Sequence, residues 1–269
     1  MSEININRQR LTLRIGRGTL AVSTIAEDEG LQHVVYEPYV VKSGISMAAN
    51  LREAFKNCDL LLQTPPRVRV LFDSDVLIVP VEMFNENDAA TMMHHAFPNT
   101  EQDAVYYNVV PDLNCVALFA MNRDLRLVID DHFRDVQLIA ASTPVWRHLH
   151  HRSFTGTARK LYGYFHEKQL SVFSFQQNRF KFCNSFEAAR SHDALYFLLY
   201  AWQQLQLQSE HDELHLVGDI PEQEWFLGQL RRFLQKVYIV NPQADFTDHP
   251  AAKVKGMPYD LMTLYAKGR

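Results

Sequence analysis

Two stretches of the chain, 149 residues apart, share one outline, and this repeat constrains the fold more than any other feature. RLTLRIGRGTLAVSTI (10–25) and RKLYGYFHEKQLSVFSF (159–175) each begin with a basic residue. Each continues as an alternating apolar run, a short polar turn and a second alternating run. Such alternation is typical of strands with one buried face. The sequence therefore predicts two hairpins that open two similar halves of the chain.

The elements after each hairpin follow the same order. In the first half we predict strands at 10–16, 19–26 and about 32–41, a helix capped by Ser46 that ends before Pro65-Pro66, and a strand at 67–72. In the second half we predict strands at about 160–166, 169–176 and 179–184, a helix capped by Ser191, and a strand at 213–220. Both caps are predicted because a serine hydroxyl can accept a free N–H of the first helical turn.

The segment between the two repeats has its own pattern. Residues at about 105–152 read as strand, strand, helix, strand and helix, which predicts a small α+β subdomain inserted in the first half. We therefore divide the chain into a first half at 1–157, which includes this subdomain, and a second half at 158–269. The chain has no low-complexity tract or flexible linker, so the halves are expected to be closely joined.

The composition excludes several classes of protein. A formal net charge of −4 and an isoelectric point near 6.3 give no reason to propose nucleic acid as the general partner. The N-terminus has no apolar signal region, and no run approaches the roughly 18 apolar residues of a membrane span. We expect a cytoplasmic protein that does not insert into membranes. Its three cysteines, Cys58, Cys115 and Cys183, are interpreted as reduced core thiols.

The repeated element order resembles a known superfamily. Three antiparallel strands, a helix and a parallel strand, occurring twice, are similar to the ribonuclease-H-like fold duplicated in the actin, sugar kinase and Hsp70 ATPase superfamily. The inserted subdomain is similar to the one in the pilus-assembly branch. More closely, the chain resembles an uncharacterised family of bacterial proteins with an actin-like ATPase fold. The resemblance implies an α/β fold with α+β character, and it covers nearly the whole chain.

The same resemblance implies where a nucleotide would bind in the first half. In the superfamily, the turn between the first two strands of each half holds phosphate, and an Asp beside a Gly-rich turn orients the metal. In IGRGT (15–19), Gly18 and Thr19 match this pattern, but Gly16 stands where the Asp is expected. The metal-orienting carboxylate is missing from this turn.

The second half departs further from the superfamily pattern. The turn HEKQ (166–169) has neither the Asp nor a glycine, although Glu167 could supply a charge and Lys168 could meet a phosphate. The adenosine motif, a strand followed by two glycines, lies over LHLVGD (214–219), where Gly218 matches and Asp219 replaces the second glycine. All three signatures are eroded.

Phosphoryl transfer depends on positioned metal and charge, so we expect a relative that does not hydrolyse nucleotide, with no catalytic residue, metal or required cofactor. The leading hypothesis is a binding or assembly module with an unidentified protein partner. A second is an ATP-binding protein or weak ATPase that uses Mg²⁺ and a carboxylate such as Glu167 or Asp219. A third is a small-molecule or peptide binder that uses the interdomain cleft. The sequence leaves the oligomeric state open.

Other polar clusters are interpreted as structural. His94-His95 offers no i, i+4 partner for a metal site. In RHLHHR (147–152), His148 and His151 could share a helix face, but no Cys or carboxylate lies nearby in the sequence to complete a site. These histidines are expected to be solvated, and RHLHHR could also contact an anion or an acidic partner. Asp73-Ser74-Asp75 is expected to form a turn after its strand, and Asp130-Asp131-His132 the polar face of a helix.

Overall fold

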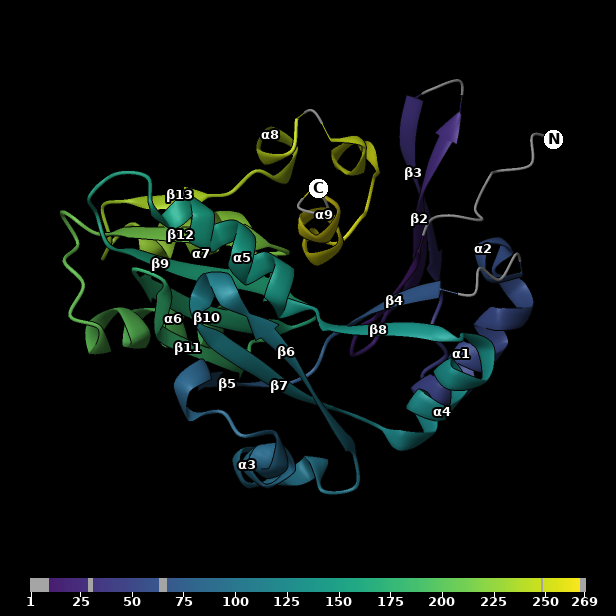
Figure 1. Ribbon diagram of the computed structural model, residues 1–269. Helices are drawn as coiled ribbons and strands as arrows, with labels where there is room; N and C mark the ends of the chain where they lie inside the picture. Colours follow the sequence, from purple (N-terminus) through teal and green to yellow (C-terminus); the bar gives the residue numbers. More distant parts are fainter. Residues whose placement is uncertain (1–9, 29–30, 63–66, 248, 267–269) are drawn as a thin grey trace. The chain divides into compact units, whose positions relative to one another are not determined.

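The computed structural model describes residues 10–28, 31–62, 67–247 and 249–266, which form two compact units. The first unit comprises Met1–Val110, Cys115–Pro144 and Phe246–Arg269, and the second comprises Pro111–Asn114 and Val145–Asp245. Figure 1 labels most of their helices and strands.

The first unit contains a five-stranded mixed sheet in the order β3-β2-β1-β4-β8. Its strands are β1 (Leu11–Ile15), β2 (Leu20–Asp28), β3 (Leu31–Tyr39), β4 (Arg67–Phe72) and β8 (Asp135–Ala140). β1 pairs antiparallel with β2 and parallel with β4, and β4 pairs parallel with β8. The predicted first hairpin, third strand and parallel strand are therefore confirmed.

Apolar side chains on one face of this sheet form its core with three helices. Leu11, Leu13 and Ile15 of β1 are almost completely buried in that cluster. The helices are α1 (Met47–Asn57), α2 (Asp59–Leu62) and α4 (Arg123–His132). Ser46 caps α1 as predicted, because its hydroxyl accepts a hydrogen bond from the Ala49 N–H at 3.2 Å.

The single helix predicted after Ser46 is divided in the structure. The backbone is extended at Cys58, where α1 ends and α2 follows. The carboxylate of Glu37 accepts the N–H groups of Asp59 and Leu60 at 3.0 and 3.1 Å, so a side chain from β3 caps the start of α2. This long-range cap could not be read from helical spacing.

A three-stranded antiparallel sheet in the order β5-β7-β6 overlaps the segment predicted to form an inserted subdomain. It consists of β5 (Val76–Pro80), β6 (Ala104–Val110) and β7 (Cys115–Met121), covered by α3 (Ala89–Ala96). The subdomain was expected at about 105–152, but β8, which falls in that range, belongs to the five-stranded sheet. Val136 and Leu138 of β8 pack into the core of that sheet, while β5, outside the range, joins the small one.

The second unit repeats the five-stranded sheet in the order β11-β10-β9-β12-β13. Its strands are β9 (Lys160–His166), β10 (Gln169–Gln176), β11 (Arg179–Glu187), β12 (Glu213–Gly218) and β13 (Val237–Ile239). β9 lies between an antiparallel β10 and a parallel β12, as β1 lies between β2 and β4. The matching orders confirm the duplicated ribonuclease-H-like α/β fold.

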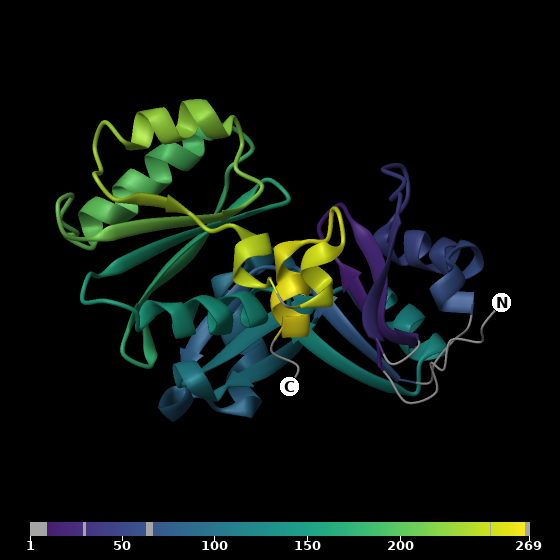
Figure 2. The same cartoon turned by 90° about the horizontal axis from the view of Figure 1, so that it is seen from above.

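Helices cover both faces of the second sheet, as Figure 2 shows. α6 (Ser191–Gln204) and α7 (Gln223–Leu230) pack on one face, and α5 (Ser142–Ser153) lies on the other. The predicted Ser191 cap is wrong: Arg190 occupies the N-cap position, and the Ser191 hydroxyl donates instead to Glu222. Ser191 is buried, so its hydroxyl bonds to a neighbouring element.

The second compact unit differs from the predicted second half (158–269) at both ends, because its main segment is Val145–Asp245. α5 packs in the second unit, where Trp146 contacts Phe180 edge to face with ring centroids 5.2 Å apart. The last helix, α9 (Tyr259–Ala266), returns to the first unit. There the Tyr265 hydroxyl bonds to the Ser23 hydroxyl at 2.8 Å. The division of the duplication at residues 157 and 158 stays a prediction.

The remaining short elements connect these layers. They are the four-residue α8 (Pro242–Asp245) and the 3-10 turns η2 (Val81–Met83), η3 (Glu86–Asp88), η4 (Pro98–Thr100), η5 (Pro111–Leu113) and η6 (Pro250–Lys253). Over the described part of the chain, no helix is both long enough and apolar enough to cross a membrane.

Candidate functional site

The turn between β1 and β2 carries three of the predicted nucleotide-binding residues, Gly16, Gly18 and Thr19. Its backbone closes on itself, because the Gly16 N–H donates to the Thr19 carbonyl at 2.8 Å. Gly18 does not adopt a left-handed conformation, and a Cβ built on it meets no atom within 4 Å. A side chain at Gly18 would therefore point into open space.

The Thr19 hydroxyl is held from the neighbouring strand. The Arg14 guanidinium donates to Thr19 Oγ1 at 2.7 Å and to both carboxylate oxygens of Asp260 at 2.8 to 3.0 Å. The Arg14 and Asp260 side chains are 3% and 1% exposed. A buried Arg–Asp pair with this geometry compensates its own charge. The hydroxyl matched by the resemblance is thus part of a structural network.

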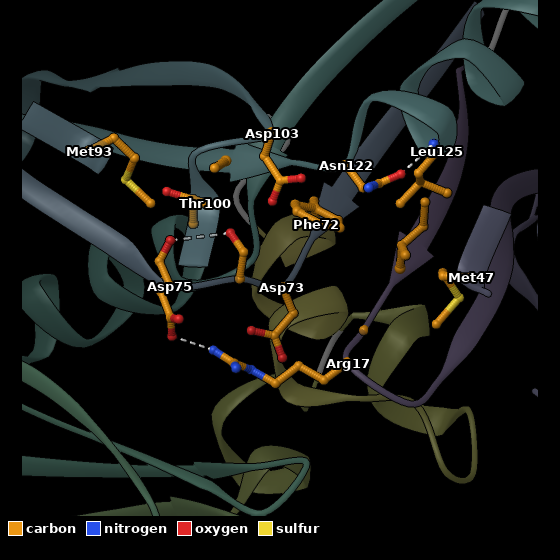
Figure 3. A pocket seen from close by; sticks show the side chains of 14 residues that line it. Arg17, Met47, Phe72, Asp73, Asp75, Met93, Thr100, Asp103, Asn122 and Leu125 are labelled. Atoms are coloured by element: carbon orange, nitrogen blue, oxygen red, sulfur yellow. Dashed lines mark hydrogen bonds and ion pairs between the residues drawn. The ribbon is translucent and has the colours of Figure 1, made fainter. Parts of the chain in front are cut away.

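A pocket of about 300 Å³ opens beside the same turn, within the first unit (Figure 3). Its lining comes from the end of β1 and the turn after it, the end of β4 and the segment after it, and the starts of α1 and α4. α3, β7 and the segment 100–103 before β6 complete it. The lining residues are Ile15, Gly16, Arg17, Met47, Phe72, Asp73, Ser74, Asp75, Met93, Thr100, Asp103, Ala120, Asn122 and Leu125. The carboxyl ends of adjacent parallel strands meet at one edge of a sheet, which is where open α/β sheets place ligands.

Asp73, expected to be a turn residue, is a buried part of this pocket. It is 5% exposed, and its N–H donates to the Ile15 carbonyl at 2.9 Å, which extends the β1–β4 ladder by one residue. A carboxylate therefore stands next to Gly16, where the turn itself has none. The sequence signal was available: Asp73 follows a strand that pairs in parallel with β1.

Two further acidic residues line the pocket with the basic turn residue. Arg17 Nη2 donates to Asp75 Oδ1 at 2.6 Å, and their side chains are 34% and 43% exposed. Figure 3 shows the carboxylate of Asp103 directed into the pocket from the opposite side. Asn122 caps α4, because its side-chain Oδ1 accepts hydrogen bonds from the N–H groups of Asp124 and Leu125.

In the second unit, Glu167 and Lys168 form the two-residue turn between β9 and β10. Both have positive φ, at 44° and 65°, while His166 and Gln169 pair across the strands. Two left-handed residues define the mirror-image turn that matches the twist of a hairpin. The conformation of this turn is therefore explained by the hairpin alone.

Gly218 is required where it stands for a structural reason. Its φ is +93°, and a Cβ at this position would lie 1.9 Å from the Phe165 carbonyl oxygen on β9. The next N–H, that of Asp219, donates to the same carbonyl at 3.1 Å. The structure brings Glu167, Lys168, Gly218 and Asp219 to the same end of β9 and β12. Gly16, Gly18 and Thr19 belong to the first unit.

The histidines do not assemble a metal site. In the part of the chain that the structure describes, no group of three or more His, Cys, Asp or Glu residues could hold a metal ion. The expectation of solvated histidines is wrong for His150, which is 2% exposed and bonds through Nε2 to the Gln177 carbonyl at 3.0 Å. His148 bonds to the half-buried Asp245 at 3.4 Å.

Two of the three thiols are buried core groups. Burial raises the pKa of the Cys115 thiol to about 12. Burial, with a smaller effect of the Glu37 carboxylate, raises the pKa of Cys58 to about 11. Both stay protonated at neutral pH and are poor nucleophiles. Cys183, expected to be a core thiol as well, is partly exposed and is not part of a disulfide.

Solved structures with the same architecture define the class of fold. A protein from Bacteroides thetaiotaomicron VPI-5482, described as having an actin-like ATPase fold and unknown function, is 24% identical, with a TM-score of 0.84. The match covers 98% of this chain and 99% of that one. The PilM-PilN complex of type IV pilus biogenesis is 13% identical with a TM-score of 0.57, over 89% of this chain and 90% of that one. The chain has an actin-like ATPase fold.

The sequence also places the chain in a family. Residues 1–237 match the family described as "Protein of unknown function (DUF3822)", and the chain belongs to that family. No curated protein matches the sequence.

Proposed function

We propose that the protein is a non-catalytic binding or assembly module built on the actin-like fold. The observation that carries this proposal is the state of the β1–β2 turn. It has no carboxylate, its Gly16 N–H is used inside the turn, and its Thr19 hydroxyl is held by Arg14. Phosphoryl transfer needs donors and charges aimed at the phosphate rather than at each other.

Two observations in the second unit support the same proposal. The conformations of Glu167 and Lys168 are those of an ordinary hairpin turn, and Gly218 is required by its contact with Phe165. These residues of the eroded nucleotide motifs therefore have structural explanations that need no ligand. The PilM-PilN complex is a protein assembly in which the same fold occurs, which favours a protein partner.

A second candidate function rests on Asp73. This carboxylate lies beside Gly16, and Gly18 leaves open space at the turn, so an ATP-binding protein could take its missing acidic group from β4. The residues of the β1–β2 turn do not fit Mg²⁺-ATP as the superfamily pattern implies, and Asp73 is engaged with neighbouring groups. The non-catalytic proposal is therefore preferred.

Thermal unfolding of the purified protein with and without millimolar ATP and Mg²⁺, together with a phosphate-release assay, tests the choice. A ligand at 100 times its dissociation constant adds about 2.7 kcal/mol of stability to the native state. We expect no shift of the melting temperature and no phosphate above the blank.

A stabilisation by ATP that is lost in Gly18→Val and in Asp73→Asn, but kept in Gly44→Val, would support the ATP-binding candidate instead. Gly44 is a matched control because a Cβ there also meets no atom within 4 Å. Phosphate release that disappears in Asp73→Asn would refute the non-catalytic proposal.

A further inference from the structure

The pocket of the first unit has a chemistry that does not suit phosphate. Three carboxylates, those of Asp73, Asp75 and Asp103, line it together with one cationic side chain, that of Arg17. Arg17 already pairs with Asp75. A phosphate in this space would meet acidic side chains without an unpaired cation to receive it.

Asp103 supplies a carboxylate for a ligand. Its backbone is fixed, because its N–H donates to the Thr100 carbonyl at 2.9 Å. Its side-chain oxygens accept no hydrogen bond from any described residue, and Figure 3 shows them directed into the pocket. Asp73 already interacts with neighbouring groups, so the carboxylate of Asp103 is the one that a ligand would contact first.

The ion pair between Arg17 and Asp75 can open at small cost. With side chains 34% and 43% exposed, it contributes at most about 1 kcal/mol to stability. A cation entering the pocket can therefore exchange with Arg17 for Asp75. The carboxylate of Asp75 therefore becomes available to a ligand only when a positively charged group of that ligand replaces Arg17.

The remaining walls of the pocket are apolar and adaptable. They are formed by Ile15, Met47, Phe72, Met93, Ala120 and Leu125. Met93, from α3, is fully buried at the base of the small sheet, while Met47 at the start of α1 is partly exposed. Methionine side chains follow irregular ligand shapes more easily than branched ones do. The pocket thus combines an apolar wall with a carboxylate.

We propose that this pocket binds an organic cation, an ammonium or guanidinium group carried on a short apolar stem. A volume of about 300 Å³ is at the small end of ligand pockets, which suits one such group with its stem. The same chemistry occurs in a free alkyl amine and in a lysine or arginine side chain of a partner protein. Binding of the cation goes beyond the proposed function and does not depend on the absence of ATP hydrolysis.

Methionine-methyl NMR tests this proposal at the site itself. The chain has eight methionines, of which Met47 and Met93 line the pocket and Met257 and Met262 are buried elsewhere in the first unit. We expect agmatine and N-acetyl-arginine methylamide to shift the Met47 and Met93 signals saturably at millimolar concentration. The neutral analogue N-acetyl-citrulline methylamide should leave all four signals in place.

Two substitutions give effects of opposite sign. Asp103→Asn should weaken the binding of agmatine about tenfold or more, because it removes the charge from a charge-assisted hydrogen bond. Arg17→Gln should strengthen it several-fold, because Asp75 is then unpaired. Asp193→Asn, on an exposed position of α6, is the matched control and should change nothing.

The competing outcomes are distinct. Equal binding of agmatine and the arginine amide would identify a small amine as the source, and tighter binding of the arginine amide would identify a protein segment. The proposal is overturned by the absence of a saturable shift, by an equal response to the citrulline analogue, by unchanged binding in Asp103→Asn, or by weaker binding in Arg17→Gln. A shift of Met47 and Met93 by ATP alone would also overturn it.

Discussion

The guanidinium of Arg14 and the carboxylate of Asp260, 246 residues apart in the chain, form a buried ion pair with three hydrogen bonds. Arg14 lies on the first strand of the sheet and Asp260 on the last helix, so the pair fixes α9 on the sheet of the first unit. The same guanidinium reaches Thr19. Arg14 therefore both holds α9 on the sheet through Asp260 and binds the Thr19 hydroxyl at the β1–β2 turn.

Breaking this pair should strongly destabilise the first unit. Asp260→Leu or Arg14→Met leaves one uncompensated buried charge, which costs about 3–5 kcal/mol, whereas the double variant should lose much less than the sum of the two. Urea unfolding of the four proteins measures the coupling. Asp130→Ala, which removes an exposed Arg126–Asp130 pair on α4, should cost less than about 1 kcal/mol. A cost for Asp260→Leu no larger than this control would contradict a stabilising role.

The same substitution to Ala should strongly destabilise the protein at Gly218 and leave its stability nearly unchanged at Gly18. Gly218→Ala combines a left-handed backbone with a contact of 1.9 Å to the Phe165 carbonyl and should lose about 3 kcal/mol or more. Gly18→Ala adds a methyl group in open space and should stay within about 0.5 kcal/mol of the wild type. Thermal unfolding compares the two. If Gly218→Ala were as stable as Gly18→Ala, the glycine would need another explanation.

Asn108 acts as a strand partner for β8. Its Nδ2 donates to the Leu138 carbonyl at 2.9 Å, and its Oδ1 accepts the Ala140 N–H at 2.8 Å. Asn108→Ala removes both bonds and should cost about 1–3 kcal/mol, with faster hydrogen exchange at the Ala140 amide. The exposed Asn57→Ala, which loses a bond to a helix carbonyl, is the control and should not change that exchange. Unchanged protection of Ala140 would rule out the partner role.

The sequence predicted the sheets well because their signals are local. Alternation in the two hairpins and the cap at Ser46 each depend on a few neighbouring residues, and all are confirmed. The place of β8 in the five-stranded sheet and the break at Cys58 depend on partners far along the chain, β4 for β8 and Glu37 for α2.

The candidate site was only partly predictable for the same reason. Gly16, which lines the pocket, was a candidate because the turn is a local motif, while the pocket also needs Asp73 and Asp103 from separate segments. The spacing of residues along the chain could not predict that Arg14 binds Thr19 and also pairs with Asp260, because Asp260 lies on the last helix. Parallel pairing of β4 with β1 was the one signal that could have placed Asp73 beside Gly16.

The stability of the second unit should depend on pH through Asp212. Its carboxylate accepts from the Arg159 guanidinium at 2.6 and 3.2 Å and from two backbone N–H groups, those of Arg159 and Gln208. Burial alone would raise the pKa of Asp212, but the hydrogen bonds and the charge of Arg159 outweigh it and hold the pKa below the ordinary 3.8. The native state therefore favours the ionised form more than the unfolded state does.

A lowered native pKa gives a stabilisation that is fully present above the unfolded pKa and is lost as the pH falls through the native pKa. The free energy of unfolding should exceed that of Asp212→Asn by a constant amount above about pH 5, and the difference should shrink below 3.8. Urea unfolding of both proteins at a series of pH values measures it. A difference that stayed constant down to the acid limit would mean that Asp212 is not stabilised as a carboxylate, because only the ionised form accepts all four hydrogen bonds.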